Sequence, residues 1–442
     1  MGIGQAMKRA SVLYIAPVLP ACQGNGLAMR AGLILQGLAR CCDVHLFVVP
    51  VAGEGAATSE FVRQHTARVG SLELSRYLDP HFKLIARVSN PEERFQAELA
   101  YPKPQLSRFC TSESVRRVME WAGPRIDAVH VMRLYLAPLA EGFLRLSASA
   151  RPMCVLDLDD DEVRTRERMA RLAAASGDAK VAAFEAAEAK KYAVATKRYL
   201  ATFDRVTVCA ADDATRLGAQ FPEATFMVVP NGCAPPPASS ARRPLREGPL
   251  RVLLVGTFGC YVNRDAAFFL CRDVLPALRR LTGRQIQIDL VGSGGAQALG
   301  ELSTPAREPL RVPGTTALSP AVKIHDFVVD LRPLYSLADV AVVPLRAGGG
   351  TRIKILEAFA HGVPVVSTRI GAEGISVADG KHLLLADDAE AFARACLQVK
   401  ENPELACGLA MRASALLHER YIPARIVDAV SALYAGIEGH EP

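Results

Sequence analysis

The chain has 442 residues, of which 50% are hydrophobic and 22% charged, and its formal net charge is +6. This length exceeds what one hydrophobic core usually serves, so we expect a globular protein of two domains. The small positive charge, together with a single tryptophan and scattered aromatic residues, excludes a protein that wraps extensively around nucleic acid.

Cysteine and histidine usage narrows the class further. The eleven cysteines contain no CxxC pair, and the nine histidines contain no HxxxH pair. We therefore expect a reducing compartment and no structural metal site. No run of about 18 apolar residues occurs, so no transmembrane helix is expected. These features predict a cytoplasmic protein. Any contact with a membrane is expected to be peripheral and at its inner face.

The first apolar segment, SVLYIAPVLPAC, has two interpretations. After Lys8 and Arg9 it resembles a lipoprotein signal ending at Cys22. Alternatively, Val12–Pro17 is a buried strand followed by a loop. The run is short and interrupted by proline, and a helical pattern and a second strand follow it. We therefore favour the strand, as the start of a βαβ unit.

Strand and helix patterns then alternate along the chain. In the first half a helix is predicted at Leu27–Cys41, with strands at Val44–Val49, Ala128–Met132, Met153–Leu158, Arg205–Cys209 and Thr225–Val229. In the second half, strands are predicted at Leu250–Val255, Ile286–Val291, Val322–Val328, Val340–Pro344 and Pro364–Ser367. The intervening helices are predicted at Ala266–Leu281, Leu331–Leu337, Ile353–His361, Ala389–Glu401 and Leu405–Tyr421.

A proline-rich stretch with clustered cations separates the two sets and reads as a linker. The predicted organisation is a first Rossmann-like domain over 1–232, a linker over 233–248, a second Rossmann-like domain over 249–424 and a C-terminal helix over 425–442 that returns to the first domain. Alternating β and α segments predict an α/β protein of two doubly wound Rossmann-like domains. Such sheets bind ligands at the carboxyl ends of their strands, so the two domains should face an interdomain cleft.

The Ala-, Glu- and Lys-rich stretch Asp178–Tyr199 predicts a long exposed helix. Its cations could touch anionic lipid, but a solvated helix face is the favoured interpretation.

The segment PLRAGGGTRIKILEAFAHG follows a predicted strand and opens a helix near Thr351. Glycines let backbone N–H groups approach an anion, and a helix N-terminus adds partial positive charge. Arg352 and Lys354 oppose the helix dipole in its first turn, which an anionic ligand would explain. The spacing is not that of a P-loop.

Glu357 shares one helical face with Gly350, Lys354 and His361. One interpretation is a Lys354–Glu357 ion pair next to a flexible connector. The other is a ligand-binding face, with a phosphate at the glycine and lysine end and a diol at Glu357, because a carboxylate readily accepts two hydroxyl hydrogen bonds.

These residues carry a family resemblance. The stretch PLRAGGGTRIKILEAFAHGVPVVSTRIGAEGI resembles the donor-site segment of the GT-B retaining glycosyltransferases that build cell-surface glycans, in the branch with a glycine-rich loop before LEA. Further similar segments are VVPNGC at 228–233, LLVGTFGCYVNRDAAFFLCRDVLPAL at 253–278, IDLVGSGG at 288–295 and HDFVVDLRPLYSLADVAVVPL at 325–345. They cover nearly all of the C-terminal half, whereas the N-terminal half matches more loosely.

The resemblance implies a nucleotide-diphosphate sugar in the second domain. By it, Glu357 binds the ribose, and the backbone around Phe327 and Val328 contacts the base. The diphosphate and sugar face the glycine-rich loop and the cations after it: Gly348, Gly349, Gly350, Thr351, Arg352 and Lys354. Asn263 and Arg264 lie where many relatives place phosphate-binding groups.

In the first domain, the resemblance implies that the loop Gly24, Asn25 and Gly26 approaches the phosphates and the acceptor. The implied reaction moves a hexose-like glycosyl unit to an acceptor hydroxyl with retention of configuration. Lys354 and Arg352 would stabilise the departing diphosphate without a metal or a cofactor. The acceptor is expected to be a glycan, a lipid-linked molecule or a small molecule, and nucleic acid is not an expected partner.

Two positions depart from the family pattern. Most relatives carry an E-x7-E pair, but the residue eight positions before Glu357 is Gly349. Many also carry an active-site histidine two residues after a first one, whereas here Met132 and Arg133 follow His130. We expect Arg133 to face the cleft as a catalytic group and His130 to be a packed strand residue.

Three alternatives remain open. The acidic residues Asp157, Asp159, Asp160 and Asp161 are the best candidates for a rival metal site, although we interpret them as structural or acceptor-side. A GT-B sugar-nucleotide epimerase would act without an acceptor. A catalytically silent nucleotide-sugar-binding protein would bind the donor without turnover.

Overall fold

The computed structural model describes residues 9–51, 58–236, 248–295, 297–298 and 321–437. It divides into two units. The first comprises Met1–Gly232, Gly349–Thr351 and Pro423–Pro442, and the second comprises Cys233–Gly348 and Arg352–Ile422. Of the predicted linker over 233–248, residues 237–247 lie outside the described residues.

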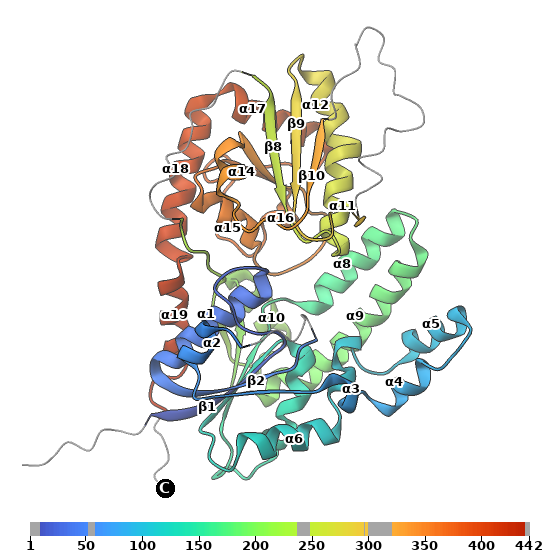
Figure 1. Ribbon diagram of the computed structural model, residues 1–442, viewed down its shortest axis with the longest axis vertical. Helices are drawn as coiled ribbons and strands as arrows, with labels where there is room; N and C mark the ends of the chain where they lie inside the picture. Colours follow the sequence, from blue (N-terminus) through green and yellow to red (C-terminus); the bar gives the residue numbers. More distant parts are fainter. Residues whose placement is uncertain (1–8, 52–57, 237–247, 296, 299–320, 438–442) are drawn as a thin grey trace, which may run out of the picture. The chain divides into compact units, whose positions relative to one another are not determined.

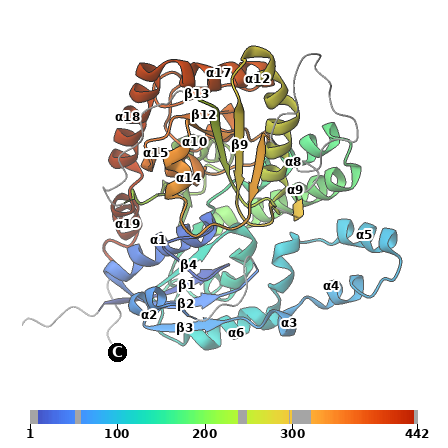
Figure 2. The same ribbon diagram turned by 45° about the horizontal axis from the view of Figure 1, so that its top comes forward.

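The first unit is built on a seven-stranded sheet whose described ladders are all parallel, in the order β3-β2-β1-β4-β5-β6-β7. Figure 2 shows β3, β2, β1 and β4 side by side in this order. The strand bounds are Ala10–Ala16 (β1), Cys42–Val48 (β2), Arg68–Ser71 (β3), Ala128–Met132 (β4), Met153–Asp157 (β5), Arg205–Val208 (β6) and Phe226–Val228 (β7). The apolar segment that could be a signal is therefore the interior strand β1.

Helices cover both faces of this sheet. Leu13 and Ile15 pack into one core cluster, while Val12 and Tyr14 pack into the other, as the two-residue period of a strand requires. The helices are α1 (Gly26–Cys41), α2 (Glu60–His65), α3 (Leu74–Tyr77), α4 (Pro80–Ile85), α5 (Pro91–Ala100), η1 (Gln105–Phe109), α6 (Ser112–Ala122), η2 (Leu134–Ala140), α7 (Glu141–Leu144), α8 (Glu162–Ala175), α9 (Ala179–Tyr199), η3 (Leu200–Thr202) and α10 (Ala211–Gln220).

The C-terminal segment belongs to the first unit. Helix α19 (Pro423–Ala432) packs against α1 (Figure 1), and Val430 fills the space that a side chain at Gly37 would occupy. Beyond it, the Tyr434 hydroxyl lies 2.7 Å from Nδ1 of His130. His130 is thus a buried residue of β4, and burial lowers its pKa to about 4.

The second unit is built on a six-stranded sheet of order β10-β9-β8-β11-β12-β13, in which all described ladders are parallel. Figure 1 shows β8, β9 and β10 side by side. The strand bounds are Leu250–Val255 (β8), Ile286–Val291 (β9), Val322–His325 (β10), Val340–Val343 (β11), Val365–Ser367 (β12) and Leu384–Leu385 (β13).

Helices cover both faces of this sheet too, since Val252 and Leu254 join one core cluster and Leu253 joins another. The helices are α11 (Tyr261–Phe269), η4 (Leu270–Val274), α12 (Leu275–Leu281), α14 (Arg332–Leu337), α15 (Ile353–Ala360), α16 (Arg369–Ala372), α17 (Ala389–Glu401) and α18 (Pro403–Arg420). The prediction of two doubly wound α/β domains is confirmed.

Three local predictions need correction. The helix predicted from Ala266 already begins at Tyr261 and contains a π-helical turn at Leu270–Val274. Strand β10 ends at His325 instead of continuing to Val328. Helix α9 is only partly exposed, because it packs against α8, α5 and η2, and its buried residues include Lys191 and Tyr192.

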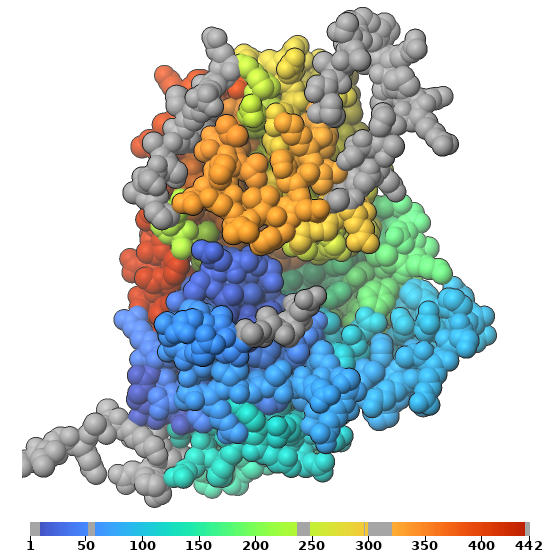
Figure 3. All heavy atoms as spheres, viewed as in Figure 1, coloured from blue at the N-terminus to red at the C-terminus, as the bar shows by residue number. Residues whose placement is uncertain are grey.

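Helices α3, α4 and α5 form an arm of the first unit that the sequence did not suggest. Helix α5 packs against α9, and the blue spheres of this arm form a lobe of the surface in Figure 3. Along the described part of the chain, no helix combines the length and the apolar character needed to cross a membrane.

The hydrogen bond between Tyr434 and His130 yields a stability prediction. Tyr434→Phe should lower the free energy of unfolding of the first unit by about 1–3 kcal/mol, because it leaves a buried ring nitrogen unpaired. Tyr14→Phe is the matched control. Its hydroxyl makes longer contacts, 3.3 Å to Ala31 O and 3.4 Å to Met132 Sδ, so it should cost less. Denaturant titration of both variants checks this, and an equal or smaller loss for Tyr434→Phe would contradict it.

Candidate functional site

The strand order of the second unit identifies where a ligand should bind. The chain runs outward from β8 through β9 to β10, and then in the opposite direction from β11 through β12 to β13. In a doubly wound sheet the ligand crevice lies where this direction changes, at the carboxyl ends of the two central strands. Here those strands are β8 and β11.

The loop after β11 contains the glycine run. Gly348 and Gly350 have positive φ angles of 110° and 68°, which side-chain-bearing residues rarely adopt. A Cβ at Gly348 would also lie 2.8 Å from Nη2 of Arg352. Helix α15 begins after Arg352, which is its N-cap residue. The sequence therefore specifies a tight turn from strand to helix, with the backbone of Gly348 beside a guanidinium.

Lys354 connects the loops on both sides of the switch point. Its Nζ donates to Asn263 Oδ1 at 2.7 Å, and Asn263 Nδ2 donates to Thr257 O at 3.0 Å in the loop after β8. Asn263 and Lys354 are 91 positions apart in the chain. Burial, with the nearby charge of Arg352, lowers the pKa of Lys354 to about 8. No Lys354–Glu357 ion pair forms among the described residues.

Arg264 lies differently from Asn263. Its guanidinium is 5.5 Å from the centre of the Tyr261 ring on the same helix. The described contacts thus bring Asn263, but not Arg264, to Lys354.

Glu357 lies in the second turn of α15, three residues after Lys354. The Tyr335 hydroxyl donates a long hydrogen bond of 3.5 Å to Glu357 Oε2, and the Tyr335 ring stacks on His361 at a centroid distance of 4.4 Å. Burial raises the pKa of Glu357, while the Lys354 charge and the Tyr335 hydrogen bond oppose the rise. Tyr335 was not predicted as a site residue, whereas His361 was predicted to share the helical face of Glu357.

The segment after β10 presents an aromatic ring to solvent. The side chain of Phe327 is 68% exposed, whereas Val328 packs against the core cluster that contains Tyr335. Val328 thus anchors this segment on the cluster of Tyr335, the hydrogen-bond partner of Glu357, while Phe327 and Val329 stay exposed.

In the first unit, the corresponding switch point lies between β1 and β4. Gly24 has a φ of 111°, Asn25 caps helix α1 by accepting from the Ala28 N–H at 2.9 Å, and Gly26 is the first helical residue. The predicted loop is an exposed helix N-terminus at the carboxyl edge of the sheet, a geometry that suits anions.

Arg133 follows β4 directly and is held by two carboxylates. Its Nη1 lies 2.9 Å from Asp159 Oδ2, and its Nη2 contacts Glu162 Oε1. Arg133 and Asp159 are the two non-glycine residues with positive φ in the described chain. Strained backbone of this kind concentrates at functional sites. A direct catalytic role for Arg133 stays a prediction, and its charge is already balanced.

The acidic cluster after β5 is divided among separate partners. Asp157 binds the buried guanidinium of Arg30 at 2.5 and 2.8 Å, and Asp159 accepts from Asn231 at 3.0 Å. Asp161 caps α8 and pairs with Arg216 at 2.6 Å. No group of three metal-ligating side chains occurs in the described residues. Arg30 was not predicted as a site residue, although an arginine flanked by apolar residues in the first half of α1 was a usable signal.

Parts of this chain are similar in sequence to known proteins. Residues 249–402 match the family model described as glycosyl transferases group 1. The chain is 34% identical over 192 residues to the lipopolysaccharide core biosynthesis glycosyltransferase LpsE of Rhizobium meliloti (strain 1021), covering 43% of this chain and 52% of that protein. It is 27% identical over 101 residues to an uncharacterized 44.6 kDa protein in the cps region of Klebsiella pneumoniae, covering 23% of this chain and 26% of that protein. The chain thus spans between about a quarter and a half of the length of these relatives.

Solved structures match over almost the full length. Sucrose-phosphate synthase from Thermosynechococcus elongatus has a TM-score of 0.65 at 17% identity, covering 96% of this chain and 98% of that chain. Anabaena HepE in complex with UDP-glucose has a TM-score of 0.59 at 15% identity, covering 96% of this chain and 99% of that chain. The chain therefore has the GT-B fold of these solved structures, and its residues 249–402 are similar to the group 1 glycosyl transferases.

Proposed function

We propose that the protein is a retaining, hexosyltransferase-like enzyme. It moves a sugar from a nucleotide-diphosphate donor to an acceptor hydroxyl in glycan or glycoconjugate biosynthesis of the cell envelope. The observation that carries the proposal is the contact between Lys354 and Asn263, which places a cation beside a glycine-rich helix N-terminus at the switch point of a parallel sheet. The similarity of residues 249–402 to the group 1 glycosyl transferases, and that of the chain to the lipopolysaccharide core glycosyltransferase LpsE, support the reaction class.

The proposed donor site assigns one task to each group. Lys354, Arg352 and the backbone of Gly348–Thr351 face the diphosphate and the sugar, with Asn263 orienting the Lys354 ammonium and Arg264 adding positive charge. Glu357 accepts hydrogen bonds from the ribose hydroxyls. The backbone at Phe327 and Val328 contacts the base. Negative charge grows on the diphosphate as the glycosidic bond breaks, so fixed donors placed there lower the barrier.

The first unit would serve the acceptor. In this proposal the Gly24–Gly26 loop approaches the phosphates and the acceptor, which is a glycan, a lipid-linked molecule or a small molecule. We infer that the enzyme works in the cytoplasm and reaches lipid-linked acceptors by peripheral contact with the membrane. Cosedimentation with anionic vesicles at low and high salt tests this, since charge attraction alone is screened by salt.

A first prediction separates the roles of Glu357 and Lys354. Glu357→Gln should raise the donor KM with little change in kcat, because a ribose contact is equally strong in the ground state and the transition state. Lys354→Ala should lower kcat by about 100-fold or more, because it removes a partner of the developing charge. Donor kinetics measured with excess acceptor distinguish the two effects.

Arg280→Ala is a control for these variants, since Arg280 is exposed and pairs with Glu390 away from the glycine loop. Unchanged kinetics in both site variants would refute the assignment. Donor binding without any turnover in the unmodified protein would favour the catalytically silent alternative. Release of free sugar without an acceptor would favour the epimerase.

A second prediction concerns pH. The pKa of Lys354 is lowered to about 8, so the free protein loses this positive charge as pH rises through that value. The kcat/KM for the donor should therefore fall above about pH 8, by up to about tenfold per pH unit. In Lys354→Arg the fall should move to much higher pH, because arginine stays protonated. An identical profile in both proteins would show that another group titrates.

A third prediction concerns metal ions. Because backbone N–H groups and cations are assigned the leaving-group charge, we expect transfer to continue in excess EDTA. The assay is initial rate with and without chelator, followed by Mg²⁺ or Mn²⁺. Complete loss of activity that these ions restore would instead assign a metal-binding role to the acidic residues Asp157–Asp161.

A further inference from the structure

The first unit contains a cavity of about 790 Å³ that is separate from the proposed donor site. All its lining residues come from 102–199, between helices α6 and α9 and the segment η2–α7. Its volume lies within the range of about 300–1,000 Å³ that small-molecule sites occupy. Neither the glycine-rich loop nor any other predicted donor residue lines it.

One part of the lining is apolar. Val115 and Met119 come from α6, Leu134 and Pro138 from η2, and Val194 from α9. Val194 is 67% exposed, which is unusual for a large aliphatic side chain. An apolar ligand chain that covers Val194 would remove this surface from water, a favourable step of about 25 cal/mol per Å².

Two of the lining lysines already have partners. Lys191 lies 2.9 Å from Glu188 Oε1 and 3.1 Å from Glu98 O, and its side chain is buried. Lys103 lies 2.8 Å from Asp79 Oδ2. These ion pairs hold the wall of the cavity and leave little positive charge for a ligand.

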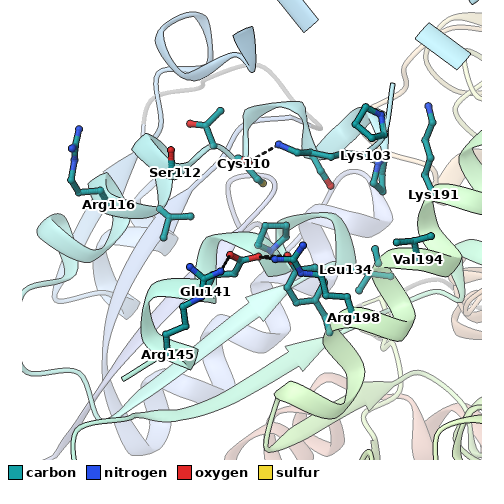
Figure 4. Close-up of a pocket in the computed structure, with 18 of the residues that line it drawn as sticks. Lys103, Cys110, Ser112, Arg116, Leu134, Glu141, Arg145, Lys191, Val194 and Arg198 are labelled. Carbon is teal, nitrogen blue, oxygen red and sulfur yellow. Dashed lines mark hydrogen bonds and ion pairs between the residues drawn. The ribbon is translucent and has the colours of Figure 1, made fainter. Parts of the chain in front are cut away.

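Three arginines at the cavity are held less completely. Arg145 and Arg198 share the single carboxylate of Glu141, at 2.7 and 2.6 Å, and Figure 4 shows Glu141 between them. Arg116 lies 3.7 Å from Glu120 and is 69% exposed on its side chain. Two guanidiniums against one carboxylate leave a net positive charge, and each guanidinium has five N–H donors, which suit phosphate oxygens.

Hydroxyl groups add neutral donors on the same side as Arg116. Thr111 caps α6, and Ser112 is its first residue; both line the cavity. The α6 N-terminus therefore contributes partial positive charge near Arg116. The cavity thus combines an apolar wall with hydroxyl donors and with more arginines than the carboxylates that pair with them. These features suit a ligand with an apolar chain and an anionic head.

We propose that this cavity binds a single amphiphilic molecule, with a phosphate-bearing head at Arg116, Arg145 and Arg198 and an apolar chain against Met119, Leu134 and Val194. The inference concerns binding by the first unit and does not depend on the proposed transfer reaction. It assigns this unit a second anion-binding site, besides the one predicted at the Gly24–Gly26 loop.

Calorimetric titration of the full-length chain with monomeric decyl phosphate tests the proposal. Decyl phosphate should bind, whereas decyl maltoside and inorganic phosphate should each bind at least about tenfold more weakly, because each lacks one of the two features. Equal binding of inorganic phosphate would overturn the role of the apolar wall. Equal binding of the maltoside would overturn the role of the arginines, and binding only to anionic vesicles would assign the effect to a membrane surface instead.

Variants locate the binding. Arg116→Glu and Val194→Asp should each weaken decyl phosphate at least about tenfold, and both positions are exposed enough to tolerate the change. Arg63→Glu is the matched control, an exposed helix arginine paired with Glu60 outside the cavity, and it should bind normally. Lys354→Ala should also bind normally. If Lys354→Ala abolished binding while Arg116→Glu did not, the phosphate would belong to the proposed donor site and this proposal would fail.

Discussion

The proposed donor site depends on the partly buried ammonium of Lys354, which forms no ion pair with a carboxylate of the described residues. Lys354 donates to a neutral amide oxygen of Asn263, and Arg352 adds a second positive charge close by. Placing a cation in such surroundings disfavours its charged form, which is why its pKa falls. An anion at the glycine-rich loop would reverse this cost, so the sequence maintains a local instability that favours binding of a phosphate.

The first unit follows the opposite rule for its buried cations. Arg30 is matched by Asp157, Arg133 by Asp159 and Glu162, and Lys191 by Glu188. Breaking one of these pairs would leave a buried charge uncompensated, which costs more than the pair contributes. These networks therefore fix strand ends and helix positions, and they differ in purpose from the unbalanced charge at Lys354.

The strands of both sheets were predictable from the sequence because both sheets are buried on both faces. Apolar runs such as Val12–Ala16 and Leu250–Val255 have few alternatives to an interior parallel strand. The turn at Gly348–Thr351 was equally visible, since glycines before cations are a local signal. These features need only neighbouring residues, which is why a reading of the sequence finds them.

The contacts within the candidate site could not be predicted in this way, because they join residues that lie far apart in the sequence. Asn263 and Lys354 meet across 91 positions, Tyr335 and Glu357 across 22, and Arg133 and Asp159 across 26. No local pattern specifies such pairs. The Lys354–Glu357 ion pair, which a helix could form by itself and which was one of two interpretations of this segment, is absent from the described contacts. The prediction that α9 is an exposed helix was wrong for a related reason. Its Ala- and Lys-rich composition is typical of a solvated helix, whereas its burial depends on packing against other helices, α8 among them.

The arginines of the cavity and the lysine of the proposed donor site also differ in their exposure to solvent. Arg116, Arg145 and Arg198 are exposed, so water and salt screen their charge and the apolar wall must supply much of the affinity for an amphiphile. Lys354 is partly buried beside a fixed amide, and there a single charge acts through a lower dielectric. A weak, screened site suits reversible capture of a ligand by its apolar chain, whereas a buried, preorganised charge suits stabilisation of a leaving group. If both proposals hold, the chain separates capture of a ligand at an exposed cavity from catalysis by a fixed, partly buried charge.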